Sequence, residues 1–263
     1  MKFLKIITVI LLTCNLVSCK KKHYNGNEVK KFEIKSSING NSYDVWVIIP
    51  ENYKENEKHR VLYFLDREWD FDLFYKASKK CGNGKYYSDL LVGIGWGNSS
   101  RESDYTPTLT SYGQGKADEF IEFIKKDLFS YMELHFNADT TRNSRCIAGH
   151  SFGGLFTAYC FVKHPSIFGN YLALSPSLWY DEQVVLRIEE ETRNQHSYNS
   201  LVYSSVGGTE SGGMLPVFSV WKEAFNSGYP TVKKNFEIIQ GQGHEGSKRA
   251  SIENGLKYYF TNR

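Results

Sequence analysis

One short stretch, residues 149–154, could carry nucleophilic chemistry, because it reads Gly-His-Ser-Phe-Gly-Gly. It stands between a short apolar run that ends at Ala148 and an apolar segment of helical character from Leu155 to Val162. Strand, sharp turn and helix form the context in which Gly-x-Ser-x-Gly strains the serine backbone and exposes its hydroxyl. The pattern predicts that Ser151 is a nucleophile; a chance match in a glycine-rich loop is the alternative.

A serine hydroxyl needs a base within hydrogen-bond reach, and that base needs an acid to orient it. In enzymes with such a turn, the acid and then the histidine follow the serine along the chain. Of seven histidines, His244 alone lies on a glycine-rich loop between the last predicted strand and the last predicted helix, and we expect it to be the base. Glu210 follows a strand in Val-Gly-Gly-Thr-Glu, which favours it as the acid, with Asp181 as the main alternative.

Acyl transfer also needs N–H donors aimed at the developing oxyanion. The backbone N–H of Phe152, at a helix N-terminus, is the expected first donor. The second is expected from the loop Asp66-Arg67-Glu68, where we assign the backbone of Arg67, with Glu68 as the alternative. This chemistry needs no cofactor. No Cys/His cluster has the spacing of zinc ligands, so no metal is predicted either.

Alternating strands and helices after a leading hairpin predict an α/β fold with a mostly parallel central sheet, an antiparallel N-terminal edge and helices on both faces. The hairpin is predicted from alternating residues at 31–38 and 43–49 around Asn39-Gly40-Asn41. Buried strands are expected at 60–65, 89–96, 145–148, 171–175, 201–206 and 234–239. Helices are expected at 71–80, 117–133, 155–162, 182–192, 215–225 and 247–259.

The chain of 263 residues, 41% of them hydrophobic, fits one globular domain, which we place at residues 30–263. The formal net charge is only +3, which gives no support for a nucleic-acid partner. Outside the first 19 residues the cysteines are Cys81, Cys146 and Cys160, an odd number without regular spacing. They do not indicate a disulfide framework.

Residues 1–18 combine a basic start, a short apolar run and a small residue before Cys19, which indicates a signal peptide. The last four residues, Leu-Val-Ser-Cys (16–19), resemble a bacterial lipobox, so we expect cleavage before Cys19 and lipid on its thiol. Residues 19–29 would then form a tether. The expected location is the bacterial cell envelope, with the protein exported and lipid-anchored to a membrane. A plain secretory signal is the alternative.

Several further motifs carry a resemblance to a known family. They are Val-Leu-Tyr-Phe-Leu-Asp (61–66), Val-Gly-Ile-Gly (92–95), Asp-Tyr-Thr-Pro (104–107), Ala-Asp-Glu-Phe (117–120), Leu-Ser-Pro-Ser-Leu-Trp-Tyr (174–180) and Gly-His-Glu (243–245). With the Gly-His-Ser-Phe-Gly-Gly stretch, they make the chain resemble the putative-esterase family of α/β-hydrolases from about residue 60 to the end. Among its branches, the siderophore-esterase-like one is the most similar.

The resemblance implies an α/β-hydrolase fold and serine hydrolysis of ester or thioester bonds in a small-molecule substrate. It also implies that Arg101 and Trp179 lie near the mouth of the site and bind substrate; a solvated arginine and a core tryptophan are the alternatives. Siderophore esters fit the branch, while carbohydrate-linked acetyl or feruloyl esters, or an inactive binding module, remain open. One departure is Arg67, where family members usually carry glycine.

Overall fold

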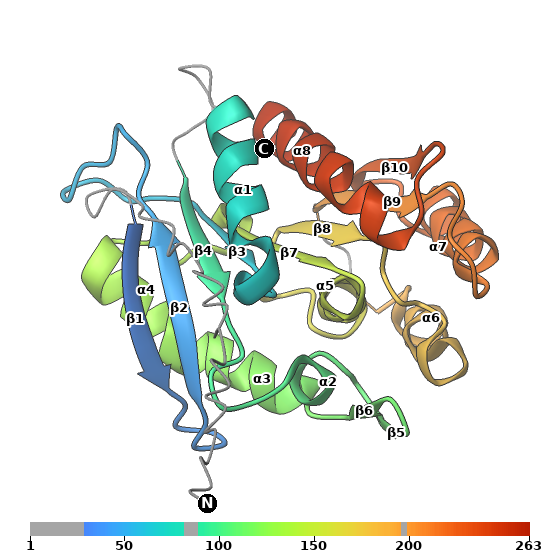
Figure 1. Cartoon of the computed structure of the whole chain (residues 1–263), viewed down its shortest axis with the longest axis horizontal. Coiled ribbons are helices and arrows are strands. Elements are labelled where there is room, and N and C mark those ends of the chain that lie inside the picture. Colours follow the sequence, from blue (N-terminus) through green and yellow to red (C-terminus); the bar gives the residue numbers. More distant parts are fainter. Residues whose placement is uncertain (1–28, 82–88, 196–198) are drawn as a thin grey trace, which may run out of the picture.

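A computed structural model describes residues 29–81, 89–195 and 199–263 (Figure 1). In this part of the chain, eight strands form one sheet in the order β1-β2-β4-β3-β7-β8-β9-β10. Their bounds are β1 Val29–Lys35, β2 Ser42–Ile48, β3 Val61–Phe64, β4 Leu90–Ile94, β7 Arg145–His150, β8 Asn170–Leu174, β9 Leu201–Gly207 and β10 Lys233–Ile239. A separate small hairpin joins β5 Leu109–Thr110 to β6 Gly113–Gln114.

The sheet has the predicted mixture of directions. Strands β1 and β2 pair antiparallel with Phe32 opposite Val45, and β2 pairs antiparallel with β4. All the other neighbours, from β4 through β3, β7, β8 and β9 to β10, pair parallel. The predicted antiparallel edge and parallel centre are therefore confirmed. Because parallel strands share one direction, the loops after β3, β7, β8, β9 and β10 all emerge at the same edge.

Helices cover both faces of the sheet. Their bounds are α1 Arg67–Cys81, α2 Arg101–Asp104, α3 Ala117–Phe123, α4 Phe129–Phe136, α5 Phe152–Lys163, α6 Tyr180–Thr192, α7 Met214–Gly228 and α8 His244–Asn262, with a π-helical segment η1 Ile124–Leu128 and a 3₁₀ turn η2 Arg142–Ser144. Figure 1 shows α1 and α8 side by side. These two pack on Leu62 and Phe64 of β3, whereas α3 to α7 pack with Val61 and Tyr63 on the opposite face.

The structure differs from the predicted elements mainly at their ends. The helix predicted at 117–133 is a continuous run, α3-η1-α4, with the π-helical segment in the middle. The last helix begins at His244 instead of residue 247, so the expected base lies in its first turn. The short elements α2, β5 and β6 were not predicted, because two to four residues are too few for hydrophobic periodicity to register.

The N-terminal predictions lie mostly outside the described residues. The signal peptide, Cys19 and the tether as far as residue 28 lie outside the described residues. Val29, which we assigned to the tether, is the first residue of β1. In the described ranges, no helix is both long enough and apolar enough to cross a membrane. There too, Cys81, Cys146 and Cys160 are free thiols, in agreement with the cysteine count.

Candidate active site

Ser151 stands on the predicted sharp turn between β7 and α5, with backbone angles φ 61° and ψ −117°. This conformation is sparsely populated by L-residues and persists only where the surroundings enforce it. A Cβ added to Gly149 would lie 2.4 Å from the backbone of Gly153, and one added to Gly154 would lie 2.7 Å from the carbonyl oxygen of Leu174. The two glycines therefore let strand, turn and helix approach closely enough to hold the serine in its strained conformation.

His244 and Glu210 are in direct contact. The two atoms His244 Nδ1 and Glu210 Oε2 are 2.7 Å apart, with the Glu210 side chain 0% exposed and the His244 side chain 35% exposed. Glu210 Oε1 also accepts hydrogen bonds from the backbone N–H of Gly207 at 2.6 Å and from Ser175 Oγ at 2.5 Å. Burial alone would raise the pKa of Glu210, but these donors outweigh it and lower that pKa below its usual value. The carboxylate is thus held ionised and fully bonded.

The loops that carry these two residues meet because β9 ends in glycine. A Cβ on Gly207 would lie 2.5 Å from the carbonyl oxygen of Gln242, in the loop that leads to His244. The backbone N–H of Thr209 donates to that same carbonyl at 3.0 Å, which ties the two loops together. By contrast, Asp181 accepts a hydrogen bond from Thr108 Oγ1 at 2.8 Å and has no contact with His244. Of the two candidate acids, Glu210 is therefore the one that is placed to orient His244.

Two serines that sequence reasoning left without a role complete this centre. Ser175 supports Glu210, as described, and Ser177 Oγ lies 3.4 Å from Ser151 Oγ. The backbone N–H of Ser177 also donates to the carbonyl of Ser151 at 3.1 Å. Both belong to the Leu-Ser-Pro-Ser motif at the end of β8, which carries part of the resemblance to the putative-esterase family. They directly follow a buried strand and lie between Ser151 and Glu210 in the chain, which is the sequence signal that could have revealed them.

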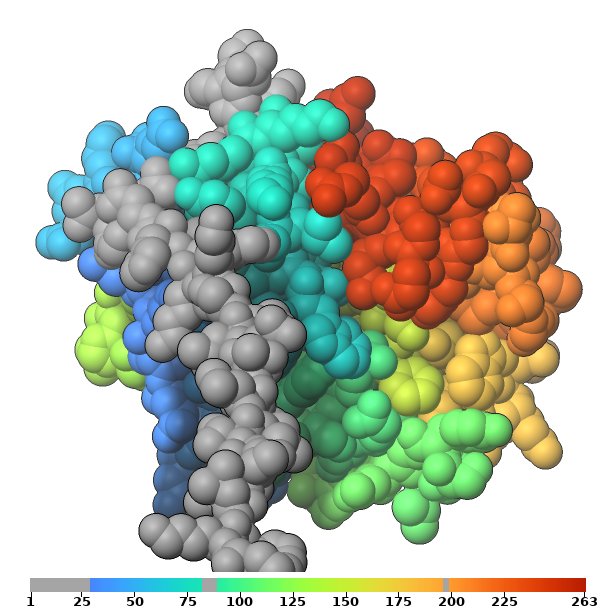
Figure 2. All heavy atoms as spheres, in the orientation of Figure 1, coloured from blue at the N-terminus to red at the C-terminus, as the bar shows by residue number. Residues whose placement is uncertain are grey.

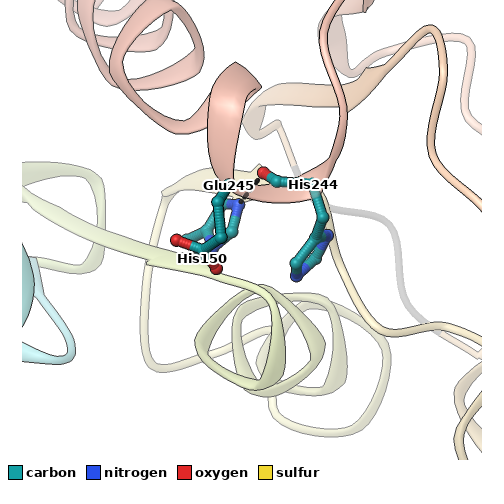
Figure 3. Close-up of side chains that lie close together, drawn as sticks. All are labelled: His150, His244 and Glu245. Atoms are coloured by element: carbon teal, nitrogen blue, oxygen red, sulfur yellow. Dashed lines mark hydrogen bonds between the residues drawn. The ribbon is translucent and has the colours of Figure 1, made fainter.

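Ser151 Oγ makes no hydrogen bond to His244 in this structure; its hydroxyl contact is with Ser177. His150 lies next to the imidazole of His244, with ring centroids 4.6 Å apart. Its Nε2 donates to the main-chain carbonyl of His244 at 3.1 Å, the contact drawn as a dashed line in Figure 3. His150 therefore fixes the first residue of α8. Burial, and then repulsion by His244, hold the pKa of His150 well below its usual value, so this ring stays neutral.

One group of potential metal ligands occurs in the described ranges: His150, His244 and Glu245, whose ligand atoms lie within 4.8 Å of one another (Figure 3). Sequence spacing did not predict it, because β7 and α8 bring the two histidines together from distant positions. Each member already has another partner: His244 contacts Glu210, His150 contacts a carbonyl, and Glu245 pairs with Lys248 at 3.1 Å. These contacts satisfy the three side chains without a metal ion. The absence of a metal from the working protein stays a prediction.

The two backbone N–H groups predicted as oxyanion donors, those of Phe152 and Arg67, both lie at helix N-termini. Phe152 and Arg67 are the first residues of α5 and α1, and the first N–H groups of a helix have no intrahelical acceptor. The two helices begin after neighbouring strands, and the backbone N–H of Leu65 donates to the carbonyl of Ala148 at 3.0 Å. The loop after β3 therefore runs beside the turn that carries Ser151.

Arg101 and Trp179 both lie close to the ring of Phe152. Arg101 forms a two-pronged ion pair with the buried Asp66 at 2.9 and 3.0 Å, and its guanidinium lies 5.4 Å from the Phe152 ring. With its side chain 13% exposed, the solvated alternative for Arg101 is wrong. Trp179 is half-buried, 6.3 Å from the Phe152 ring and 5.7 Å from the exposed ring of Tyr112. Trp179 thus reaches the surface, and substrate binding by either residue stays a prediction.

Comparison with known proteins identifies the family of the chain. Residues 36–227 match the model of the family described as Putative esterase. The chain belongs to that family. The ferri-bacillibactin esterase BesA of Bacillus subtilis is 29% identical over 184 residues, which is 62% of each chain. The siderophore enterobactin esterase of Emericella nidulans is 38% identical over 72 residues, 27% of this chain and 24% of that protein. The chain therefore spans less than two thirds of the length of these relatives.

Solved structures show the same fold. The BES protein of Bacillus cereus superposes with a TM-score of 0.80 at 23% identity, covering 91% of this chain and 98% of its own. An IroE-like serine hydrolase of Shewanella oneidensis gives a TM-score of 0.78 at 22% identity, covering 89% and 80%. At such identities the likeness establishes the fold alone. The architecture is that of the α/β-hydrolases, as the motifs implied.

The strain at Ser151 predicts an unusual order of stability. Because glycine adopts φ 61°, ψ −117° freely, Ser151→Gly should be more stable than Ser151→Ala by about 1 kcal/mol. Urea unfolding of the two variants measures the difference. Ser177, which lacks a positive φ, provides the matched pair: there glycine should be the less stable substitution. The same order at both positions would show that the Ser151 backbone is unstrained.

Neutral, buried His150 predicts a pH effect on stability. Its folded pKa is lowered, so below about pH 6.5 the unfolded chain takes up a proton that the folded protein refuses. The His150 contribution therefore lowers the free energy of unfolding as pH falls, by at most about 1.4 kcal/mol per pH unit. Buried Asp70 and Asp104, with pKa values raised to about 7 and about 6, act in the opposite direction.

The comparison is thus between wild type and His150→Gln, which keeps a donor for the His244 carbonyl. Urea unfolding at pH 7.5, 6.5 and 5.5 should show the variant gaining stability relative to wild type as pH falls. A constant difference across that range contradicts a depressed pKa.

Proposed function

We propose that this protein is a serine esterase that hydrolyses carboxylic ester bonds through an acyl-enzyme, with Ser151 as nucleophile, His244 as general base and Glu210 as the orienting acid. The observation that carries the proposal is the 2.7 Å contact between His244 Nδ1 and buried Glu210, at the sheet edge where Ser151 occupies a strained turn. The order of the three along the chain, serine, acid, histidine, is that of α/β-hydrolases.

In the first half-reaction, His244 Nε2 takes the proton from Ser151 Oγ as the oxygen attacks the ester carbonyl carbon. Glu210, bound to Nδ1, keeps the imidazole in the tautomer that leaves Nε2 free to accept, and it stabilises the imidazolium that forms. Ser151 Oγ has to turn from Ser177 toward His244 for this step. Hydrogen bonds between catalytic groups are often loose before substrate binds.

The negative charge that develops on the carbonyl oxygen is stabilised by the backbone N–H groups of Phe152 and Arg67. His244 then gives its proton to the departing alcohol, which leaves the acyl group on Ser151 Oγ. In the second half-reaction, a water loses a proton to His244 and attacks the acyl carbonyl. The proton returns to Ser151, and the carboxylic acid departs.

We further infer that the substrate is a siderophore-type ester. The support is that relatives at 29% and 38% identity carry the names ferri-bacillibactin esterase and siderophore enterobactin esterase. A third relative, from Aspergillus fumigatus, is named siderophore triacetylfusarinine C esterase and is 24% identical over 162 residues. These names cover both bacterial and fungal proteins, so the shared property is the class of ester and not one particular compound.

Substitution of the triad tests the mechanism. Ser151→Ala should abolish ester hydrolysis and labelling by a fluorophosphonate probe. Glu210→Gln should lower kcat by about 10² to 10⁴ with little change in KM, because the neutral amide no longer fixes the tautomer or stabilises the imidazolium. Hydrolysis of short-chain p-nitrophenyl esters and of enterobactin-type esters provides the readout.

Asp181→Asn is the matched control for Glu210→Gln, since it neutralises the rival carboxylate that lies away from His244. Its kcat should stay within about twofold of wild type. Full activity and labelling in Ser151→Ala would refute the serine mechanism. A large loss in Asp181→Asn with none in Glu210→Gln would reassign the acid.

We propose that the mature protein begins at a lipid-modified Cys19 and is anchored in the bacterial cell envelope, at the periplasmic or outer-membrane face. The support is the sequence of residues 1–19 alone: a basic start, a short apolar run and Leu-Val-Ser-Cys. Several acyl chains at one residue would give a stable anchor, because each buried CH₂ contributes about 0.8 kcal/mol.

Replacing the lipidated cysteine tests this anchor. Cys19→Ala should abolish incorporation of labelled palmitate and move the protein from the membrane to the soluble fraction. Cys14→Ala, which removes the other cysteine of the leader, should leave both unchanged. Palmitate incorporation that survives Cys19→Ala would exclude this site of lipidation.

A further inference from the structure

Three side chains that can bind a metal lie together at the proposed active site, although they come from two distant parts of the chain. His150 ends β7, whereas His244 and Glu245 begin α8, and their ligand atoms lie within 4.8 Å of one another (Figure 3). Around a tetrahedral zinc ion with bonds of about 2.1 Å, ligand atoms are about 3.4 Å apart. The group is therefore somewhat wider than an occupied site, by an amount that small side-chain rotations close.

Each of the two imidazoles keeps one nitrogen lone pair for a metal. His244 Nδ1 carries its proton toward the Glu210 carboxylate, 2.7 Å away, which leaves the lone pair on Nε2. His150 Nε2 donates to the main-chain carbonyl of His244 at 3.1 Å, which leaves the lone pair on Nδ1. Histidines that bind metals typically donate their other N–H to a carboxylate or a backbone carbonyl in this way, which fixes the tautomer. Both rings are therefore held in the form that coordinates a metal.

Charge and exposure at this group both favour a cation. The Glu245 side chain is 76% exposed and pairs with Lys248 at 3.1 Å, while Lys248 also lies 3.3 Å from Asp70. The ammonium therefore stays paired when Glu245 turns toward a metal, and the charges of Glu210 and Glu245 remain in excess. Figure 2 shows α8 bordering on α1 and α5 on one face of the molecule. Because His244 and Glu245 are both partly exposed, an ion can reach the group from solvent.

The geometry points to an inhibitory zinc site formed by His150, His244 and Glu245, with water in the fourth position. Two imidazoles and one carboxylate suit Zn²⁺, whereas Mg²⁺ and Ca²⁺ prefer ligand sets made of oxygen alone. Coordination takes the Nε2 lone pair of His244, which is the pair that accepts the proton of Ser151. The zinc-bound protein therefore cannot activate its nucleophile. The effect on catalysis rests on the proposed function, while zinc binding itself does not.

Titration of the chelator-treated protein with Zn²⁺ tests the site. Calorimetry should find one high-affinity Zn²⁺ per chain. Zn²⁺ should inhibit hydrolysis of p-nitrophenyl esters and labelling by a fluorophosphonate over the same range of concentration, and EDTA should restore both. Mg²⁺ over that range should do neither. His150→Gln, which keeps a donor for the His244 carbonyl, and Glu245→Gln should each weaken binding and inhibition by at least about tenfold. His135→Gln, at an exposed histidine of α4, is the matched control and should change neither.

The outcomes separate the zinc site from the esterase proposal. The absence of saturable Zn²⁺ binding, or an affinity that either His150→Gln or Glu245→Gln leaves unchanged, would overturn the site. Because Glu245 lies on the surface, its variant tests the site independently of any effect of His150→Gln on folding. Calorimetry needs no catalysis, so His244→Gln, which should also lose the high-affinity binding, can be measured too. Unchanged hydrolysis by Ser151→Ala would instead overturn the esterase proposal and leave the calorimetric result in place.

Discussion

The centre of this molecule depends on one buried carboxylate. Glu210 has no exposed side-chain surface, and a charge in that position is tolerated only when its oxygens are hydrogen-bonded. Its three partners come from three different places: Ser175 after β8, Gly207 at the end of β9, and His244 at the start of α8. Satisfying Glu210 therefore fixes the relative positions of three loops, and the imidazole is oriented as a consequence.

The same loops also support the nucleophile. The backbone N–H of Ser151 donates to the carbonyl of Leu174 at 3.0 Å, and Ser177 returns a hydrogen bond to the carbonyl of Ser151. The strained turn is thus braced by the segment after β8, whose Ser175 bonds Glu210. The strained backbone of Ser151 lowers the stability of the fold by about 1–3 kcal/mol, and burial of the Glu210 carboxylate lowers it further. The hydrogen bonds of the segment after β8 help to offset both. A change in that segment should affect the acid and the nucleophile together.

Patterns with a local cause were readable from the sequence. The alternating hairpin, the continuous apolar strands and the glycine-flanked Ser151 each follow from the chemistry of neighbouring residues, and all three occur in the structure. The features that the sequence did not predict depend on contacts between distant segments. The partnership of Arg101 with Asp66 and the support that Ser175 gives Glu210 leave no periodic trace. A left-handed run such as Asp181–Gln183, all three with positive φ, is equally invisible to helix propensity.

The arginine at position 67, where family members usually carry glycine, is accommodated by contacts of the same long-range kind. A glycine after the aspartate of β3 would be essential if that position had a positive φ, but here the positive φ of 55° belongs to Asp66. The side chain of Arg67 is only 11% exposed; its guanidinium lies 2.9 Å from Asp44 and packs over the ring of Trp46. A Cβ added to Gly93 or Gly95 of the Val-Gly-Ile-Gly motif would lie within 2.9 Å of that side chain. Gly93 and Gly95 therefore make room for the arginine, and its backbone N–H, the proposed oxyanion donor, does not require a glycine.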